Sequence, residues 1–383
     1  MPLLWKKSQR STEGALFTCY SNYQQFQRKI YLLIQILTCN VSHSNPNAIY
    51  SLSRRFLVTV LFGLLVMSNG LNVLLKLDIE DLWFKAAGLL FFIGTLQVVY
   101  KMFAISRSAE EIRDLLEWIG DLHTNPSWAH LKNFVETRFR ESLLYVKRII
   151  ILSLIVTPQG MSLNMFLSDT LIYPMPGLPR DQQFIWQIFA VFIVTISVIV
   201  VDSVFMTMGF FIVGILNIFL DTIAKLNSKE FVRSSKCNLQ DYYQKHLEIM
   251  VKLRDFDELF SALLVIQLLT SCPLIVAGFF MIRLYPQMIA CYLVYAVCIG
   301  QYMLICIFGE FVHSKTEQIF RDLYLTKWYK MSIKDQMVLL MMMKMAIKPF
   351  SLKAAGMYEI NMKAFVEATK LAFSLCALLF AFD

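Results

Sequence analysis

The stretch that decides the fold is residues 184–220, FIWQIFAVFIVTISVIVVDSVFMTMGFFIVGILNIFL, in which Asp202 is the only charged residue. About 20 apolar residues are enough to cross the hydrocarbon of a bilayer, which is about 30 Å thick. As one helix this stretch would measure about 55 Å. The sequence therefore permits either one long helix that continues beyond the membrane or two shorter spans. Both possibilities predict an α-helical membrane protein.

The composition of the whole chain leads to the same class. Of its 383 residues, 57% are hydrophobic and 17% are charged, whereas soluble domains are about 45–50% apolar and about 25% charged. These values exclude a water-soluble globule, a disordered chain and a disulfide-rich scaffold. The net charge of +8 is typical of a membrane protein whose cytoplasmic loops collect Lys and Arg. We therefore expect membrane lipid, and no nucleic acid, as a partner.

Further apolar runs predict the other membrane helices, at residues 56–75, 86–100, 149–167, 259–282, 284–309 and 358–382. Lys85 and Lys101 bracket the second span, and their stems can snorkel toward the two membrane surfaces. The run 30–39 is too short to span and predicts an interfacial or re-entrant helix. The expected fold is an all-α membrane protein with seven transmembrane helices.

The distribution of Lys and Arg predicts the orientation. Seven precede the first span, and the later inner segments 106–142, 221–258 and 311–356 carry five, seven and eight. The intervening segments carry one or two each. This alternation holds if residues 184–220 form a single helix, and it then places the N-terminus in the cytoplasm and the C-terminus outside. The arrangement is opposite to that of a G-protein-coupled receptor.

Four regions follow from these spans. Residues 1–55 are expected to form a cytoplasmic segment, and residues 56–310 the first six spans with a long cytoplasmic extension at 203–258. Residues 311–356 are expected to form cytoplasmic helices and residues 357–383 the last span. The inner loops carry apolar stripes at helical spacing, at Leu239, Tyr242, His246, Ile249, Leu253 and Phe256 and at Ile333, Met337, Leu340, Met341 and Ile347. These helices would pack on their own chain or on neighbouring subunits as an anchor region, or each loop would hold a single interfacial helix.

The chain carries none of the patterns that mark an enzyme. It has no phosphate-binding glycine loop, no G-x-S-x-G elbow and no C-x-x-C pair. The five histidines fall in predicted loops without ligand spacing and are expected to be solvated, at positions His43, His123, His130, His246 and His313. We therefore expect no catalysis, no metal and no cofactor.

The last span carries an unusual row of charges. Glu359, Lys363, Glu367 and Lys370 are spaced to share one helix face, which continues through Ser374, Leu378 and Phe382. Because charged groups inside a membrane helix turn toward a partner or water, this face predicts the wall of an aqueous pore. Leu378 and Phe382 would form a hydrophobic gate at its outer end. The alternative is that residues 356–370 form a solvated helix below the bilayer.

Aromatic residues are frequent in the outer halves of the other spans, among them Phe91, Phe92, Phe192, Tyr292 and Tyr295. Such a lining would bind a small, mostly apolar molecule. Alternatively, these side chains form an interfacial belt or pack between helices.

The C-terminal third resembles a known family. It contains the run Gln301-Tyr302-Met303-Leu304-Ile305-Cys306-Ile307-Phe308-Gly309-Glu310, followed by Tyr324, Trp328, Tyr329, Lys348-Pro349, Ala355-Gly356, Phe365 and the stretch 369–379. The order and spacing of these residues over 301–383 resemble the C-terminal signature of the insect odorant receptors, and specifically of the odorant-tuning subunits.

The resemblance implies a ligand-gated, non-selective cation channel in the plasma membrane of a sensory neuron. It would assemble as a heterotetramer with a shared co-receptor subunit and bind a small apolar or aromatic volatile ligand. The last helix would line the pore, with the gate at Leu378 and Phe382. The implied pocket residues are Gly88, Phe91, Phe92, Val156, Gln159, Phe192, Ile196, Tyr292, Tyr295 and Ile299. The alternatives are a gustatory-type receptor of the same superfamily, a G-protein-coupled receptor, or a transporter with Asp202 at its substrate site; Asp202 could instead bond within the helix bundle.

Overall fold

The computed structural model describes residues 23–25, 27–32, 34–35, 56–75, 82–122, 137–152, 179–226 and 239–381. Most of the predicted third span and the predicted site residues Val156, Gln159 and Phe382 lie outside these ranges. The main helices are α3 (Leu57–Leu75), α4 (Leu82–Arg107), α5 (Ala109–Asp121), α7 (Arg180–Leu226), α9 (Leu239–Leu284), α10 (Ile289–Tyr324), α11 (Ile333–Ala346) and α12 (Met362–Ala381). Residues 137–152 are also helical. A 3-10 turn, η2 (Trp328–Lys330), precedes α11, and a hairpin of β1 (Lys353–Ala354) and β2 (Tyr358–Glu359) precedes α12.

Within the described ranges, four helices are long and apolar enough to cross a membrane. These stretches lie in α4 (Gly88–Arg107), α7 (Gln182–Leu226), α9 (Leu239–Leu284) and α10 (Cys291–Tyr324). The shorter helices α3 and α12 coincide with the predicted first and seventh spans. The predicted all-helical membrane architecture is confirmed, while the count of seven spans and the orientation of the termini stay predictions.

Helix α7 settles the choice that residues 184–220 left open, because it is one continuous helix of 47 residues. Neither glycine in this stretch forms a turn. A β-carbon on Gly209 would overlap the ring of Phe308, and one on Gly214 would press on the Ser142 hydroxyl. Both glycines therefore serve close approach to α10 and to helix 137–152. The single long helix is the condition on which the predicted charge alternation rests.

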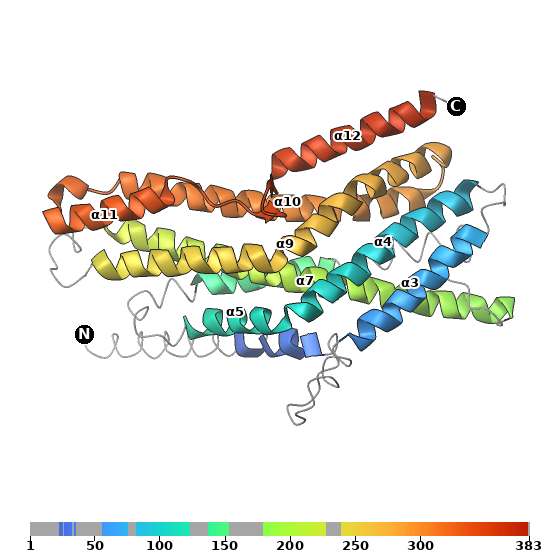
Figure 1. Ribbon diagram of the computed structural model, residues 1–383, viewed down its shortest axis with the longest axis horizontal. Helices are drawn as coiled ribbons and strands as arrows, with labels where there is room; N and C mark the ends of the chain where they lie inside the picture. The colour runs from blue at the N-terminus through green and yellow to red at the C-terminus, as the bar shows by residue number, and fades with distance from the viewer. Residues whose placement is uncertain are drawn as a thin grey trace, which may run out of the picture.

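The long helices α7, α9 and α10 extend along the length of the molecule (Figure 1). At one end α5 and α11 pack beside them, and toward the other end α12 projects away from the bundle (Figure 1). Helix α9 is the central element, since it contacts α4, α10, α12 and α11. The helices that contain the predicted spans 184–220, 259–282 and 284–309 thus continue beyond those spans. That these continuations are cytoplasmic stays a prediction.

The first half of α9 carries the predicted apolar stripe, and the structure buries it completely. The buried side chains are Leu239, Tyr242, His246, Ile249, Leu253 and Phe256. This stripe packs against its own chain. The stripe on α11 is different, because its members remain exposed, Ile333 at 81% and Ile347 at 62%. Helix α11 uses Leu339, Met342 and Ala346 to pack on the bundle instead.

The expectation of solvated loop histidines is wrong for His246 and His313, which lie in helices α9 and α10. The His246 ring is fully buried and stacks on Phe219 with 5.1 Å between centroids. Its position in the apolar stripe of α9 places the ring between α9 and α7, so that it is buried although it is polar. His313 Nδ1 lies 2.9 Å from the Ser351 hydroxyl oxygen.

Candidate functional site

A pocket lies between α4, α7, α9 and α10, the four helices that form the centre of the bundle. Its cavity volume is about 40 Å³, part of it open to the surroundings, which is room for a few water molecules and well below the roughly 300–1,000 Å³ of a site that holds a drug-sized ligand. Most of its wall is apolar, made by Leu90, Phe91, Val98, Val194, Val201, Leu274, Val294 and Val297. We refer to it below as the central pocket.

Helical spacing explains why these residues share one cavity. On α10, Val294, Val297, Cys298 and Gln301 occupy positions i, i+3, i+4 and i+7 and therefore lie on one face. The lining residues of α4 and α7 follow the same spacing. The central pocket is therefore formed by inward-facing helix positions.

One end of the central pocket is polar. Lys101 of α4 donates a hydrogen bond from Nζ to Oδ1 of Asp202 on α7 at 2.8 Å. The Lys101 side chain is 3% exposed and that of Asp202 is 25% exposed. The expectation that Lys101 snorkels to the membrane surface is wrong, because a nearby carboxylate compensates its burial among the helices. The interpretation that Asp202 bonds within the helix bundle is confirmed.

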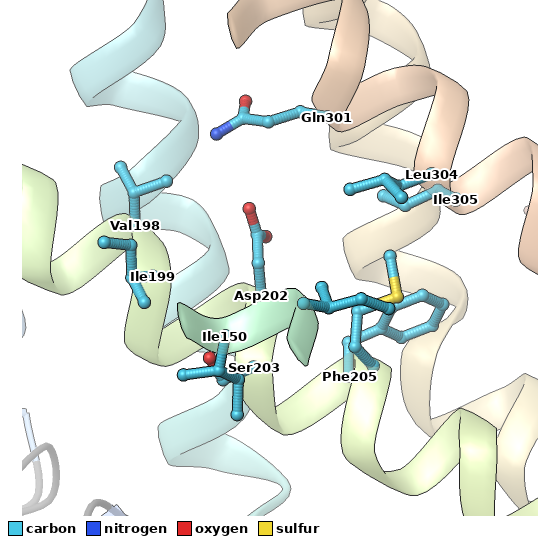
Figure 2. Close-up of a pocket in the computed structure, with 11 residues that line it drawn as sticks. Ile150, Val198, Ile199, Asp202, Ser203, Phe205, Gln301, Leu304 and Ile305 are labelled. Carbon is cyan, nitrogen blue, oxygen red and sulfur yellow. The ribbon is translucent and has the colours of Figure 1, made fainter. Parts of the chain in front are cut away.

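A second cavity of about 50 Å³, again partly open, lies on the other side of this ion pair. Figure 2 shows Asp202 and Gln301 reaching toward the same space from α7 and α10. Val198 and Gln301 line both cavities. Lys101, Asp202 and Gln301 thus form a polar group between two largely apolar spaces, and we call these three residues the polar floor.

A separate hydrogen-bonded chain lies beside the polar floor. Gln97 Nε2 donates to Gln267 Oε1 at 2.8 Å, and Gln267 Nε2 donates to the Ser271 hydroxyl at 3.1 Å. All three side chains are buried. This chain joins α4 to α9 and satisfies buried amide groups that would otherwise be costly.

The structure brings few of the residues expected to line a pocket into the central pocket. Among the described ones, Phe91 lines it, and Gly88 is buried on the same helix. The ring of Phe92 instead lies over Gly70 of α3. On α7, Phe192 and Ile196 are 56% and 40% exposed.

The three expected residues of α10 also lie elsewhere. Tyr292 is 46% exposed and donates from its hydroxyl to the Pro286 carbonyl at 3.2 Å. Tyr295 packs on Phe279 with 4.8 Å between centroids, and Ile299 is half-buried.

The pocket-lining residues that the sequence did not predict are mainly Lys101, Gln301 and the valines of α7 and α10. The isolated charges Lys101 and Asp202 in two separate spans were the available signal.

Helix α12 begins at a tightly constructed corner. Asn361 caps it, since its side-chain oxygen accepts from the Ala364 N–H at 2.9 Å, and Glu310 Oε2 accepts from the Met362 N–H at 3.3 Å. A β-carbon on Gly309 would overlap the Ile360 carbonyl oxygen. Gly309 and Glu310 of the sequence signature therefore position the start of α12.

The expected four-charge row on one helix is wrong at its first member. Glu359 lies in strand β2 and pairs with Lys353 in the hairpin register, before α12 begins at Met362. Ala355 and Gly356 adopt positive φ values of 53° and 70° in the turn. The hairpin thus takes Glu359 out of helical geometry and leaves Lys363, Glu367 and Lys370 on α12.

These three charges lie on an exposed face of α12. Lys363 and Glu367 form an ion pair at 3.8 Å, with side chains 82% and 54% exposed. Lys370, Ser374 and Leu378 continue the exposed face, with Leu378 at 54%. The opposite side is buried at Ala364, Ala372 and Cys376. A charged and then apolar face thus points away from the chain's own bundle.

These features define a multi-pass helical membrane protein with a small, largely apolar pocket inside its bundle. The family model described as 7tm odorant receptor matches residues 86–373, and the chain belongs to this odorant receptor family. The family that the C-terminal signature suggested is therefore confirmed.

Solved structures with the same fold include the insect olfactory receptor OR5 from Machilis hrabei, alone and in complex with eugenol. The structure without eugenol is 12% identical with a TM-score of 0.77, and the eugenol complex is 13% identical with a TM-score of 0.75. In both comparisons 95% of this chain and 100% of the other are covered. No curated protein sequence matches this chain.

Proposed function

We propose that this chain is the odorant-binding subunit of a ligand-gated, non-selective cation channel that assembles with a shared co-receptor in the plasma membrane of a sensory neuron. The observation that carries the proposal is the largely apolar central pocket inside the bundle of an odorant receptor family member. A solved receptor of the same fold is described as a complex with eugenol, a small aromatic molecule. A volatile ligand would occupy the corresponding bundle here.

The exposed face of α12 supports the pore assignment. In a single chain, Lys363, Glu367 and Lys370 face outward, and such charges are costly against lipid. Assembly around a central axis would turn this face toward water. Leu378 and Phe382 would then form a ring that blocks ions by dewetting when it is narrow.

The exposed stripe of α11 supports assembly. Its apolar side chains are joined by exposed aromatic residues next to the η2 turn, so that the surface comprises Tyr324, Leu325, Trp328, Tyr329, Ile333, Met337, Leu340, Met341 and Ile347. Contiguous apolar surface on a non-membrane helix is typical of a protein interface. We assign this surface to contacts with neighbouring subunits in an anchor region.

Gating would follow from a shift between two populations. The ligand must bind the open arrangement of helices more tightly than the closed one, because equal binding shifts nothing. Helix α9 is suited to transmit this change, since it lines the central pocket through Leu274 and also contacts α12.

The test is electrophysiological. The chain is expressed in oocytes or cultured cells with the co-receptor, and currents are recorded during application of a broad odorant panel; the co-receptor alone is the control. Odorant-evoked cation currents that require this chain are expected. A surface-expressed chain that yields no current with any odorant, or responses that need a G protein, would refute the proposal.

A further inference from the structure

We propose that the outward face of helix 137–152 binds anionic phospholipid at the boundary of the membrane, with Lys147 and Arg148 as the partners of the head-group phosphate. This face lies outside the central pocket and outside α12. The inference therefore goes beyond the proposed function, and its test needs neither an odorant nor a current.

Contacts along one side of helix 137–152 fix its rotation. Arg138 Nε donates to Asp221 Oδ2 on α7 at 2.8 Å, and farther along the helix Ser142 lies against Gly214. The buried side chains follow helical spacing, at Phe139, Ser142, Leu143 and Val146. The opposite side is turned away from the bundle, and its members are all exposed: Arg140, Leu144, Lys147, Arg148 and Ile151. We call these five residues the basic face.

The centre of the basic face lies level with the ends of the predicted membrane spans. Ile150, which follows Arg148 by two positions, lines a cavity together with Asp202 of α7. Asp202 in turn pairs with Lys101, which directly follows the predicted second span. Charges on three helices therefore mark one boundary. Inside the bundle Lys101 and Asp202 compensate each other, whereas Lys147 and Arg148 face the surroundings at the same level.

The cations of the basic face are available for an external partner. Arg140, Lys147 and Arg148 form no ion pair within the described part of the chain. Glu141, the acidic residue of this helix, is engaged by Arg138 at 3.1 Å. The basic face thus carries three positive charges that no described carboxylate compensates.

The order of basic and apolar side chains fits a phospholipid. A guanidinium binds phosphate oxygens in a bidentate manner, and an ammonium adds a compact positive charge. Next to them, on the side of the predicted third span, Ile151 and Leu152 are 57% and 63% exposed and offer an apolar surface to the acyl chains. Tyr145 is 55% exposed, with its ring stacked on Phe210, as is common for tyrosine in the head-group layer.

Charge complementarity decides between anionic and zwitterionic lipid. Phosphatidylcholine carries an ammonium group that balances its own phosphate, so it leaves Lys147 and Arg148 uncompensated. Phosphatidylserine brings one net negative charge to them. Each basic residue near a membrane surface favours anionic lipid about fivefold. A soluble acidic partner fits less well, because Ile151 and Leu152 lie within the predicted third span.

The experiment uses the full-length chain, purified and reconstituted into phosphatidylcholine nanodiscs with a trace of photoreactive lipid. The probe is either phosphatidylserine or phosphatidylcholine with the same photoreactive acyl chain, and labelled peptides from residues 137–152 are quantified by mass spectrometry after illumination. We expect the serine lipid to label this segment about fivefold or more above the choline lipid, and 1 M salt should reduce the difference. Equal labelling by the two lipids would overturn the inference, and this comparison needs no variant.

Variants identify the residues responsible. Lys147→Gln/Arg148→Gln should reduce the preference for the serine lipid to about twofold or less, whereas the exchange Lys147→Arg/Arg148→Lys keeps both charges and should retain it. The matched control is Lys334→Gln/Lys344→Gln, which removes the same charge from exposed positions of α11 and should leave the preference unchanged. Size-exclusion chromatography checks that each variant is folded. A folded Lys147→Gln/Arg148→Gln variant with the wild-type preference, or an equal loss in the α11 control, would refute the assignment.

Discussion

The contact between Gly309 and Ile360 gives the sharpest test of how the start of α12 is positioned. The β-carbon of an alanine at position 309 would overlap the Ile360 carbonyl oxygen, which is backbone and cannot rotate away. The segment that leads into α12 would have to move. That movement would strain the hydrogen bond from Ile360 N–H to the Leu352 carbonyl at 2.9 Å and the bond from Met362 N–H to Glu310 at 3.3 Å.

The magnitude follows from these terms. Overpacking costs about 1–3 kcal/mol, and weakening of one or two hydrogen bonds adds about 1 kcal/mol. Replacement of glycine by alanine within a helix returns about 0.8–1.0 kcal/mol. We therefore expect Gly309→Ala to destabilise the protein by about 1–3 kcal/mol.

Gly300 on the same helix is the matched control, because a β-carbon there meets no described atom within 4 Å. Gly300→Ala should gain the helix propensity term without the overlap. Thermal unfolding of both tagged variants in detergent, followed by fluorescence-detected size-exclusion chromatography, should give a lower midpoint for Gly309→Ala than for Gly300→Ala. Recordings should also show altered basal current for Gly309→Ala alone. Equal midpoints and equal currents for the two variants would refute the reasoning.

Three further predictions concern single positions. Burial lowers the pKa of His246, in the charged half of α9, to about 4. The folded state therefore binds fewer protons at this ring than the unfolded state, and the free energy of unfolding falls as the pH drops below 6.5, by about 2 kcal/mol at pH 5. A His246→Phe variant with the same acid sensitivity as the wild type would contradict this. Leu378→Ser should raise basal current by making the proposed gate polar, with Ala377→Ser as control; unchanged current would argue against a gate at that position. Asn361→Ala should lower thermal stability by about 1 kcal/mol through loss of the cap, whereas Asn361→Asp should retain it; equal loss in both would exclude the capping role.

Much of the candidate site could not be predicted from the sequence, for identifiable reasons. Hydropathy placed Phe91 and Phe92 together in the second span, but neighbouring helix positions point in different directions. Phe91 faces the central pocket and Phe92 packs over Gly70. Tyr295 is an aromatic residue of the type expected in a pocket, but its ring packs on Phe279 instead.

The sequence by itself determined the membrane class, the helical architecture and the family. Apolar runs and segment charges reflect the free energy of moving local stretches of chain from water into lipid. This free energy depends on the local sequence alone, so it can be judged without the tertiary structure. The helix through residues 184–220 and the buried apolar stripe of α9 agree with what hydropathy and helical spacing predict for these segments.

Only the tertiary structure decided which groups meet. Lys101 and Asp202 are 101 positions apart, and their pairing depends on the rotation of α4 and α7 about their axes. Glu359 lies outside α12 because its strand β2 pairs with β1 in a hairpin. The apolar stripe of α11 is exposed, whereas that of α9 is buried. Partner choice of this kind depends on contacts between elements distant in sequence, so no local property of the chain encodes it.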